Sequence, residues 1–414
     1  MRNIVWLVLL FAAAVVAALA LGDNDGLVSL YWSGWRVELS LNLFLLLVLA
    51  LGFAVVTAVQ GVNALIGLPA RARQWRDLRR ERAAQAALNE ALAELFAGRY
   101  SRSYKAAQRA LDMRGEGPGT AAENQLRQLA QLLAASSLHS LQDRGRRDQM
   151  LQRVLKPGRS VSAGPMDDGA RLLATEWALD DRDATRAQAL LAELPPGVAR
   201  RTLALRLKLQ AQRLARHPLD ALGTARLLSK HQAFSAVAAQ GLLRSLAFEA
   251  MDATHDIEQL RQVWQQFDPS DQRDPYVVAR AARRAAALGQ ADQGRQWLRP
   301  VWDQMPKLEA EARAEAAHAL VDAVDGVGDD WLKRVETAQT AHATDTAVQA
   351  AAGAVYASRH LWGKARRPLE MAANDAQRPS RVRRQCWRAL ALLAQEQGDM
   401  AMAEQCSQQA AGID

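Results

Sequence analysis

Histidine is the side chain that most often binds metals in proteins, so its spacing is the first test for chemistry. No two histidines lie three or four residues apart, and the pattern H-E-x-x-H is absent. The seven histidines are His139, His217, His231, His255, His318, His342 and His360. We therefore expect no structural zinc site, and we interpret His255 and His360 as polar turn or capping residues.

The two cysteines, Cys386 and Cys406, lack a haem signature: C-x-x-C-H is absent and neither is followed by Pro. We expect them on the two helices of the last hairpin, reduced and acting as small hydrophobic residues. The Gly-rich segment 115–119 lacks the Lys and the Ser or Thr of a phosphate-binding loop. The sequence thus predicts no catalytic residue, cofactor or metal, and a protein that is not an enzyme.

Two groups of arginines are spaced so that each group shares one face of a predicted helix. Arginine forks in such an array could bind the carboxylates of a partner protein. The alternative interpretation is a solvated, salt-bridged surface. The groups are Arg280, Arg283 and Arg284, and Arg381, Arg384 and Arg388.

The elements that carry these residues are predicted to be helices. From residue 83 onward the chain is rich in Ala, Leu, Gln, Glu and Arg, which favour helix, with short Gly, Pro or Asp turns. Candidate turns are spaced by 34 to 38 residues, close to the 34-residue tetratricopeptide period. They are Arg182, Pro218, His255, Gly289, Gly326, His360 and Gly398. We predict an α-solenoid of tetratricopeptide-like hairpins over 83–414, with a division near residue 160 left open.

The positions five, nine and twelve after each turn should form one face of the second helix of each hairpin. Nineteen of these twenty-one positions are apolar or Gly, and Lys230 and Ser407 are the exceptions. Small residues at the first position, such as Gly223 and Gly294, would let two helices cross closely. The pattern is looser upstream, where Gly98 and a turn near Gln142 mark further hairpins.

The N-terminal region is predicted to cross a membrane twice. Residues 4–21 contain no charge and would span about 27 Å as a helix, close to the thickness of a bilayer core. Residues 39–68 form a second apolar stretch, and Pro69 predicts a break or kink at its end. We therefore expect a transmembrane hairpin over 1–69. A signal peptide ending near Ala18-Leu19-Ala20 is the competing interpretation.

Aromatic and basic residues flank the two predicted spans. The segment 70–82 is a basic collar with six arginines, whereas the loop 22–38 has one Arg against three acids. By the positive-inside rule, both termini and the region 83–414 lie in the cytoplasm. The predicted membrane-interface residues are Trp6, Tyr31, Trp32, Trp35, Arg71, Arg73, Trp75, Arg76, Arg79, Arg80 and Arg82.

Composition narrows the class further. The formal net charge of +8 includes +4 from residues 71–82 alone, six Arg against Asp77 and Glu81, so no broad basic surface for nucleic acid is expected. Two cysteines in 414 residues rule out a disulfide-built scaffold. Few aromatics and no long apolar-polar alternation make an all-β fold unexpected. The predicted fold class is all-α.

The N-terminal residues resemble a known family. The loop with Gly26, Tyr31 and Trp32, the segment 35–40 (Trp-Arg-Val-Glu-Leu-Ser), the arginine collar and the segment 95–100 (Leu-Phe-Ala-Gly-Arg-Tyr) are similar to the proteobacterial HemY-type tetratricopeptide membrane proteins. The similarity is specific over about the first 110 residues. An unrelated flavin-dependent oxidase shares the family name, but the G-x-G-x-x-G turn that it needs is absent.

The resemblance implies a two-span protein of the bacterial inner membrane, with a cytoplasmic repeat domain associated with late haem and porphyrin metabolism. It also implies that the first helix of each hairpin lines a concave surface, where the two arginine groups could bind partner carboxylates or porphyrin propionates. We expect a scaffold for cytoplasmic or membrane-associated proteins, such as haem-biosynthesis enzymes, and no nucleic acid. A haem or porphyrin carrier, and an enzyme with an unrecognised site, are the alternatives.

Overall fold

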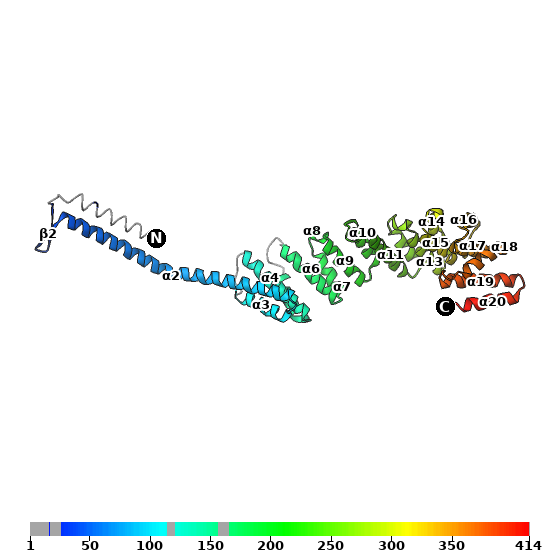
Figure 1. The fold of residues 1–414 in the computed structure, drawn as a ribbon, viewed down its shortest axis with the longest axis horizontal. Coiled ribbons are helices and arrows are strands. Elements are labelled where there is room, and N and C mark those ends of the chain that lie inside the picture. The colour runs from blue at the N-terminus through cyan, green and yellow to red at the C-terminus, as the bar shows by residue number, and fades with distance from the viewer. Residues whose placement is uncertain (1–15, 17–25, 114–120, 156–164, 414) are drawn as a thin grey trace. The chain divides into compact units, whose positions relative to one another are not determined.

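The computed structural model describes residue 16 and residues 26–113, 121–155 and 165–413 (Figure 1). The predicted first span over residues 4–21 lies outside the described residues except for Val16, as do Trp6 and the Gly-rich segment 115–119. The chain forms two compact units, Met1–Met150 and Leu151–Asp414. The described residues are almost entirely helical, which confirms the predicted all-α class.

The first unit contains one element that the sequence analysis treated as a loop. Residues Leu27–Trp32 (β1) and Trp35–Ser40 (β2) pair as an antiparallel hairpin. Its two-residue turn is Ser33-Gly34, with φ of 49° and 91°, the positive values that a tight hairpin turn requires. Each strand has only six residues, so the alternation of apolar and polar side chains is too short to predict a strand from the sequence.

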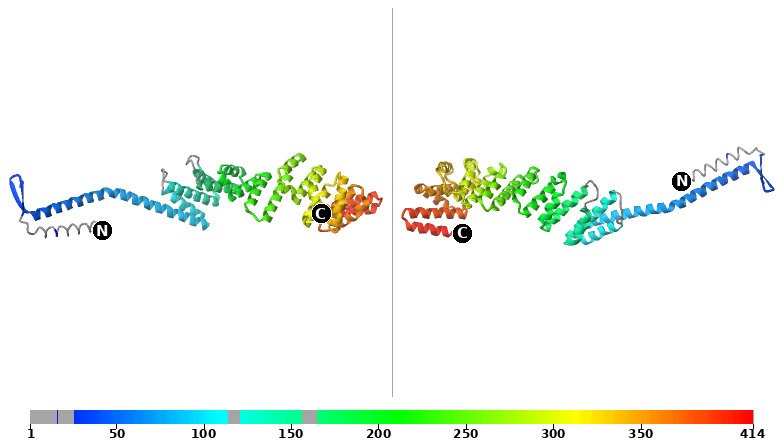
Figure 2. Two further views of the ribbon diagram at one scale, coloured as in Figure 1. Left: turned by 90° about the horizontal axis from the view of Figure 1, so that it is seen from above. Right: turned by 180° about the vertical axis from the view of Figure 1, so that it is seen from behind.

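Helix α2 (Leu41–Phe96) follows the hairpin directly and is continuous for 56 residues (Figures 1 and 2). Its segment Leu41–Val62 has a mean hydropathy of 2.6 and is unburied, so it is long and apolar enough to cross a membrane. Of the predicted break or kink at Pro69, the break is wrong, because the helix continues through this residue. A proline removes one backbone hydrogen bond, but the apolar stretch before it and the Ala- and Arg-rich stretch after it both favour helix strongly.

The far end of α2 packs on α3 (Tyr100–Asp112) and α4 (Ala121–Ser140). Alanines dominate this interface, including Ala91 and Ala107, both fully buried. Ser103 is buried as well, and its hydroxyl donates to the Ala91 carbonyl at 2.7 Å. The membrane-compatible helix therefore ends inside a small hydrophobic core.

Helices of the second unit pack in sequential pairs, preceded by α5 (Arg144–Leu155), which crosses the boundary between the units. For example, α13 contacts α14 as its partner, and it also contacts α11 and α15. The helices are α6 (Pro165–Asp180), α7 (Ala184–Ala192), α8 (Pro196–Ala199), α9 (Thr202–Leu214), α10 (Pro218–Lys230), α11 (Ala236–Asp252), α12 (Ile257–Gln265), α13 (Pro275–Ala287), α14 (Ala291–Trp302), α15 (Ala310–Asp322), α16 (Asp329–Ala341), α17 (Thr346–Ser358), α18 (Trp362–Asn374), α19 (Ser380–Glu396) and α20 (Met400–Ala411), with short 3-10 turns at Asp271–Arg273 and Met305–Lys307.

Most turns between paired helices contain a residue with positive φ. At His360, for example, the His360 N–H donates to Ala357 and the Leu361 N–H to Tyr356, which closes the C-terminus of α17. The residues are Gly98, Gln142, Arg182, Arg216, Gly289, Gly326, His360 and Gly398. A left-handed residue thus marks the turn whether or not it is glycine.

The predicted helix faces are buried after most of these turns, as Leu298, Val335 and Leu369 illustrate. Trp264 is only half-buried and stacks on Trp297 with ring centroids 4.8 Å apart.

The predicted frame is wrong after Pro218, where Gly223, Leu227 and Lys230 are exposed. The left-handed residue there is Arg216, and counting from it reaches three buried residues, Ala221, Ala225 and Leu228. Pro218 is the first residue of α10 and not the turn.

Candidate partner-binding surface

The first arginine group lies on α13 and is engaged inside the protein. Arg280 Nε donates to Asp252 Oδ1 on α11 at 3.0 Å, and Arg283 Nη2 donates to Glu315 Oε2 on α15 at 2.6 Å. Arg284 donates to the Thr254 carbonyl in the turn after α11. All three arginines are half-buried.

These contacts belong to a wider pattern in the second unit. Several arginines on one hairpin bond to a carboxylate about 30 residues away on a neighbouring hairpin. The pairs are Arg244 with Asp274, Arg313 with Asp345, Arg334 with Asp303, and Arg359 with Asp329. Arg280 and Arg283 therefore fit the alternative interpretation of a salt-bridged surface, because their guanidinium groups pair with carboxylates on neighbouring helices.

Arg295 does the same from α14 and was not singled out by the sequence analysis. Its side chain is almost fully buried and donates to the carbonyls of Asp325 at 2.6 Å and Gly326 at 3.0 Å. It thereby satisfies the backbone of the next turn. A buried arginine gives no sequence signal that distinguishes it from an exposed one.

The second arginine group lies on α19 and is only partly engaged. Arg381 pairs with Asp322 on α15, and Arg384 donates to the Ile413 carbonyl at 2.7 Å. Arg388 is exposed and, among the described residues, has no hydrogen bond or salt bridge. Of the six predicted residues, Arg388 is therefore the one whose guanidinium group has neither a hydrogen-bond nor an ion-pair partner in the described part of the chain.

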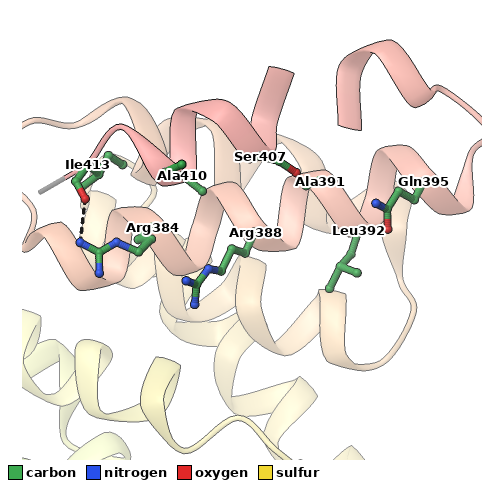
Figure 3. A pocket seen from close by; sticks show the side chains of 9 residues that line it. Arg384, Arg388, Ala391, Leu392, Gln395, Ser407, Ala410 and Ile413 are labelled. Carbon is green, nitrogen blue, oxygen red and sulfur yellow. Dashed lines mark hydrogen bonds between the residues drawn. The ribbon is translucent and has the colours of Figure 1, made fainter. Parts of the chain in front are cut away.

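Arg388 borders two hollows on α19. The larger, about 690 Å³, lies between α19 and α20 and also contains Arg384, Leu392 and Ser407 (Figure 3). The smaller, about 270 Å³, lies among α15, α17, α18 and α19, and its walls include Trp362 and Leu392. Leu392 is 57% exposed, one turn after Arg388 on the same helix. Arg388 and Leu392 thus form a cationic and apolar ridge between the hollows.

The smaller hollow also has an unsatisfied polar atom. The Gln385 amide nitrogen donates to Asp322 at 3.3 Å, whereas its buried oxygen Oε1 has no partner in the structure. Cys386 lies in the same wall and is buried, which raises the pKa of its thiol to about 12 and keeps it a neutral thiol. Cys406 is likewise free and buried.

His318 is the one histidine with a strongly perturbed environment in the described chain. It is buried on α15, neither ring nitrogen has a partner, and burial lowers its pKa to about 4. Glu315 opposes this lowering of the pKa, whereas nearby Arg381, Arg378 and Arg283 contribute to it. Among the described residues, no three His, Cys, Asp or Glu side chains gather in a metal-binding group.

The described membrane-interface residues lie on the hairpin and α2. Tyr31, Trp32 and Trp35 are exposed on the hairpin. Trp75 is exposed on α2, and the Arg79 guanidinium lies over its ring, 5.2 Å from the centroid. The remaining described arginines of the collar, Arg76, Arg80 and Arg82, are exposed on α2, whereas the side chains of Arg71 and Arg73 lie outside the described set.

The comparison with protein families decides the classification. Residues 26–142 match the family model of the HemY protein N-terminus. The N-terminal region of the chain is of the HemY type. The matched region runs from the residue before β1 to the turn after α4, so it covers the β-hairpin, α2 and the first packed helices. The family suggests an association with haem biosynthesis. A comparison with curated proteins finds no match.

Proposed function

We propose that this HemY-type protein is a membrane-tethered, non-enzymatic scaffold that gathers proteins of late haem and porphyrin biosynthesis. Its sequential helix pairs would form a tetratricopeptide-like α-solenoid, with α13, α15, α17 and α19 lining one surface. The contacts between α13 and α15, α15 and α17, and α17 and α19 support this arrangement.

The tether would be a two-pass anchor in the bacterial inner membrane, with both termini and the helical region in the cytoplasm. The apolar segment Leu41–Val62 and the arginines that follow it on α2 support this orientation. Helix α2 continues without interruption into the core that it forms with α3 and α4, so one continuous helix joins the anchor to the first helical hairpin. A partner bound beyond it would be held near the bilayer.

The available charge of Arg388 is the observation that carries the binding proposal. Arg381, two turns earlier on α19, is paired with Asp322, whereas the unpartnered guanidinium of Arg388 lies beside exposed Leu392. It would attract a carboxylate that lies next to an apolar side chain. The hollows on either side would receive the apolar groups. The partner is therefore expected to be a protein segment with alternating acidic and apolar residues.

The mechanism would be a raised effective concentration at the membrane and not bond chemistry. Two partners held on one array meet at a concentration set by their spacing, without any new catalytic group. The inert, buried cysteines are consistent with this role.

A photo-crosslinking residue at Leu392 tests the proposal in native membranes, with the similarly exposed Leu203 on α9 as the control position. We expect a specific adduct from position 392 that is lost in Arg388→Gln and absent from position 203. An adduct unaffected by Arg388→Gln, or equal adducts at both positions, would refute the assignment.

The larger hollow favours a porphyrin carrier as the second candidate. Arg384 and Arg388 flank a lining that includes Ala391, Leu392 and Ala410, which suits an apolar ring with two carboxylates. Purified full-length protein titrated with protoporphyrin should then show a new absorption band that Arg388→Gln weakens. An unchanged porphyrin spectrum would exclude the carrier and leave the scaffold.

A further inference from the structure

The register of the β-hairpin separates its side chains into two unlike faces. Residues opposite one another on an antiparallel pair share a face, and successive residues alternate between faces. One face carries the pairs Val28 with Leu39, Leu30 with Val37, and Trp32 with Trp35. The other face carries Leu27 with Ser40, Ser29 with Glu38, and Tyr31 with Arg36. One face is thus entirely apolar, and we name its six residues the apolar hairpin face.

The charges of the opposite face are satisfied within the hairpin. Arg36 pairs with Glu38 at 2.5 Å, and its guanidinium lies over the Tyr31 ring, 5.7 Å from the centroid. This face is therefore suited to water. Like an amphipathic helix, the hairpin has one apolar face and one polar face, but its side chains alternate between the faces with a period of two residues.

Four of the six residues of the apolar hairpin face are exposed in the isolated chain. Trp32 is 84% exposed, Trp35 78% and Val37 50%, and Leu30 is exposed as well, whereas Val28 and Leu39 at the base of the hairpin are half-buried. An isolated two-stranded hairpin is at best marginally stable in water, so this face needs a cover to be stable.

The position of the hairpin indicates what covers it. Ser40, the last residue of β2, caps α2 by accepting from the Leu43 N–H at 3.4 Å, and the membrane-compatible segment begins at the next residue. The Leu41 N–H also donates to the Gly26 carbonyl at 2.9 Å, which joins the base of the hairpin to the helix. In each view the hairpin projects across the end of α2 and does not continue its axis (Figures 1 and 2).

We propose that the apolar hairpin face lies on the lipid surface at the end of the span, with Trp32 and Trp35 at headgroup level and the Arg36 face toward water. Tryptophan prefers this depth because its ring is apolar and its N–H is polar. The hairpin would therefore fix both the depth and the rotation of α2. This inference rests on the proposed membrane anchoring by Leu41–Val62.

The test uses full-length protein in phospholipid vesicles, with one environment-sensitive fluorophore attached to an introduced cysteine. Leu30→Cys reports the apolar face and its neighbour Ser29→Cys the polar face, while Val37→Cys and Glu38→Cys repeat the comparison on β2. The two native cysteines are buried, and the protein without an introduced cysteine measures any background labelling.

We expect labels at positions 30 and 37 to emit at shorter wavelength than labels at 29 and 38. Spin-labelled lipid should quench positions 30 and 37 several-fold more than iodide does, whereas iodide should quench positions 29 and 38 more than spin-labelled lipid does. Equal iodide quenching on both faces would overturn the proposal. So would shielding of positions 30 and 37 from both quenchers, since a protein would then cover the face. Leu47→Cys in α2 is the separate control: if it is not quenched by lipid, the membrane span itself is wrong.

Discussion

Replacing Gly294 by alanine should destabilise the second unit, because two helices meet there too closely for a side chain. Gly294 lies on α14, and a Cβ at this position would stand 2.7 Å from the Ala282 carbonyl oxygen and 3.1 Å from the Ala282 Cα on α13. Both atoms belong to the backbone, so the clash is relieved only if the helices separate. Helix α13 also packs on α11 and α15, which resists that movement.

The expected size follows from two opposing effects. Overpacking a well-packed interface costs about 1–3 kcal/mol, and contact with backbone places this clash in the upper part of that range. Alanine recovers about 1 kcal/mol through its higher helix propensity. We expect a net loss of about 1–2 kcal/mol in the free energy of unfolding for Gly294→Ala.

Gly223→Ala is the matched control, because Gly223 is exposed on α10 and a Cβ at this position would have no other atom within 4 Å. This change should stabilise the unit by roughly 0.5–1 kcal/mol. The assay is urea unfolding of full-length protein in detergent micelles, followed by far-UV circular dichroism, with the transition midpoints compared. Equal midpoints for the two variants would refute the close approach of α13 and α14.

Three further changes test other parts of the structure. Burial lowers the pKa of His318 from 6.5 to about 4, so between these pH values the unfolded chain binds a proton that the folded chain does not. The free energy of unfolding should therefore fall by up to about 3 kcal/mol as the pH drops from 6.5 to 4. In urea unfolding at several pH values, His318→Leu should make the free energy of unfolding depend less on pH. Leu298→Ala should lower the free energy of unfolding by about 2–5 kcal/mol because Leu298 is fully buried. Leu203→Ala, on the exposed side of α9, should change it by no more than about 0.5 kcal/mol. Equal urea midpoints for the two variants would mean that the helix faces are misassigned. Arg216→Gly should stabilise the unit by up to about 1 kcal/mol, because the left-handed backbone at φ 58° disfavours a side chain. The control Lys208→Gly, inside α9, should cost about 1 kcal/mol. A loss of stability in both variants would contradict the turn geometry.

Much of the helical organisation was predictable because it depends on periodicity. Apolar positions recur with the helical period, and the turns recur every 34 to 38 residues, so the buried faces after Gly289, Gly326 and His360 follow directly. The frame failed after Pro218 because the proline begins α10, whereas the left-handed turn residue is Arg216, two positions earlier. The helix does not break at Pro69 because the strongly helical segments on both sides outweigh the intrinsic preference of this one residue.

The arginines could not be sorted by spacing on one helix alone. Arg283 and Arg388 look alike in sequence, but Arg283 meets Glu315 on a neighbouring hairpin and Arg388 meets no partner among the described residues. An acidic residue about 30 positions away, as in Arg313 with Asp345, is the signal that could have separated them. The β-hairpin was missed for another reason: its apolar face emerges only when two six-residue strands are placed in register.

The porphyrin intermediates of living cells test the scaffold most directly. The full-length chain, the chain lacking residues 1–69, and full-length Arg388→Gln would be expressed at matched levels in cells that lack the native protein. The tethered scaffold predicts that the full-length chain restores the normal porphyrin profile, that the truncated chain does not, and that Arg388→Gln restores it only in part. Full restoration by the truncated chain would contradict the tethered scaffold, since the partners would then need no gathering at the membrane.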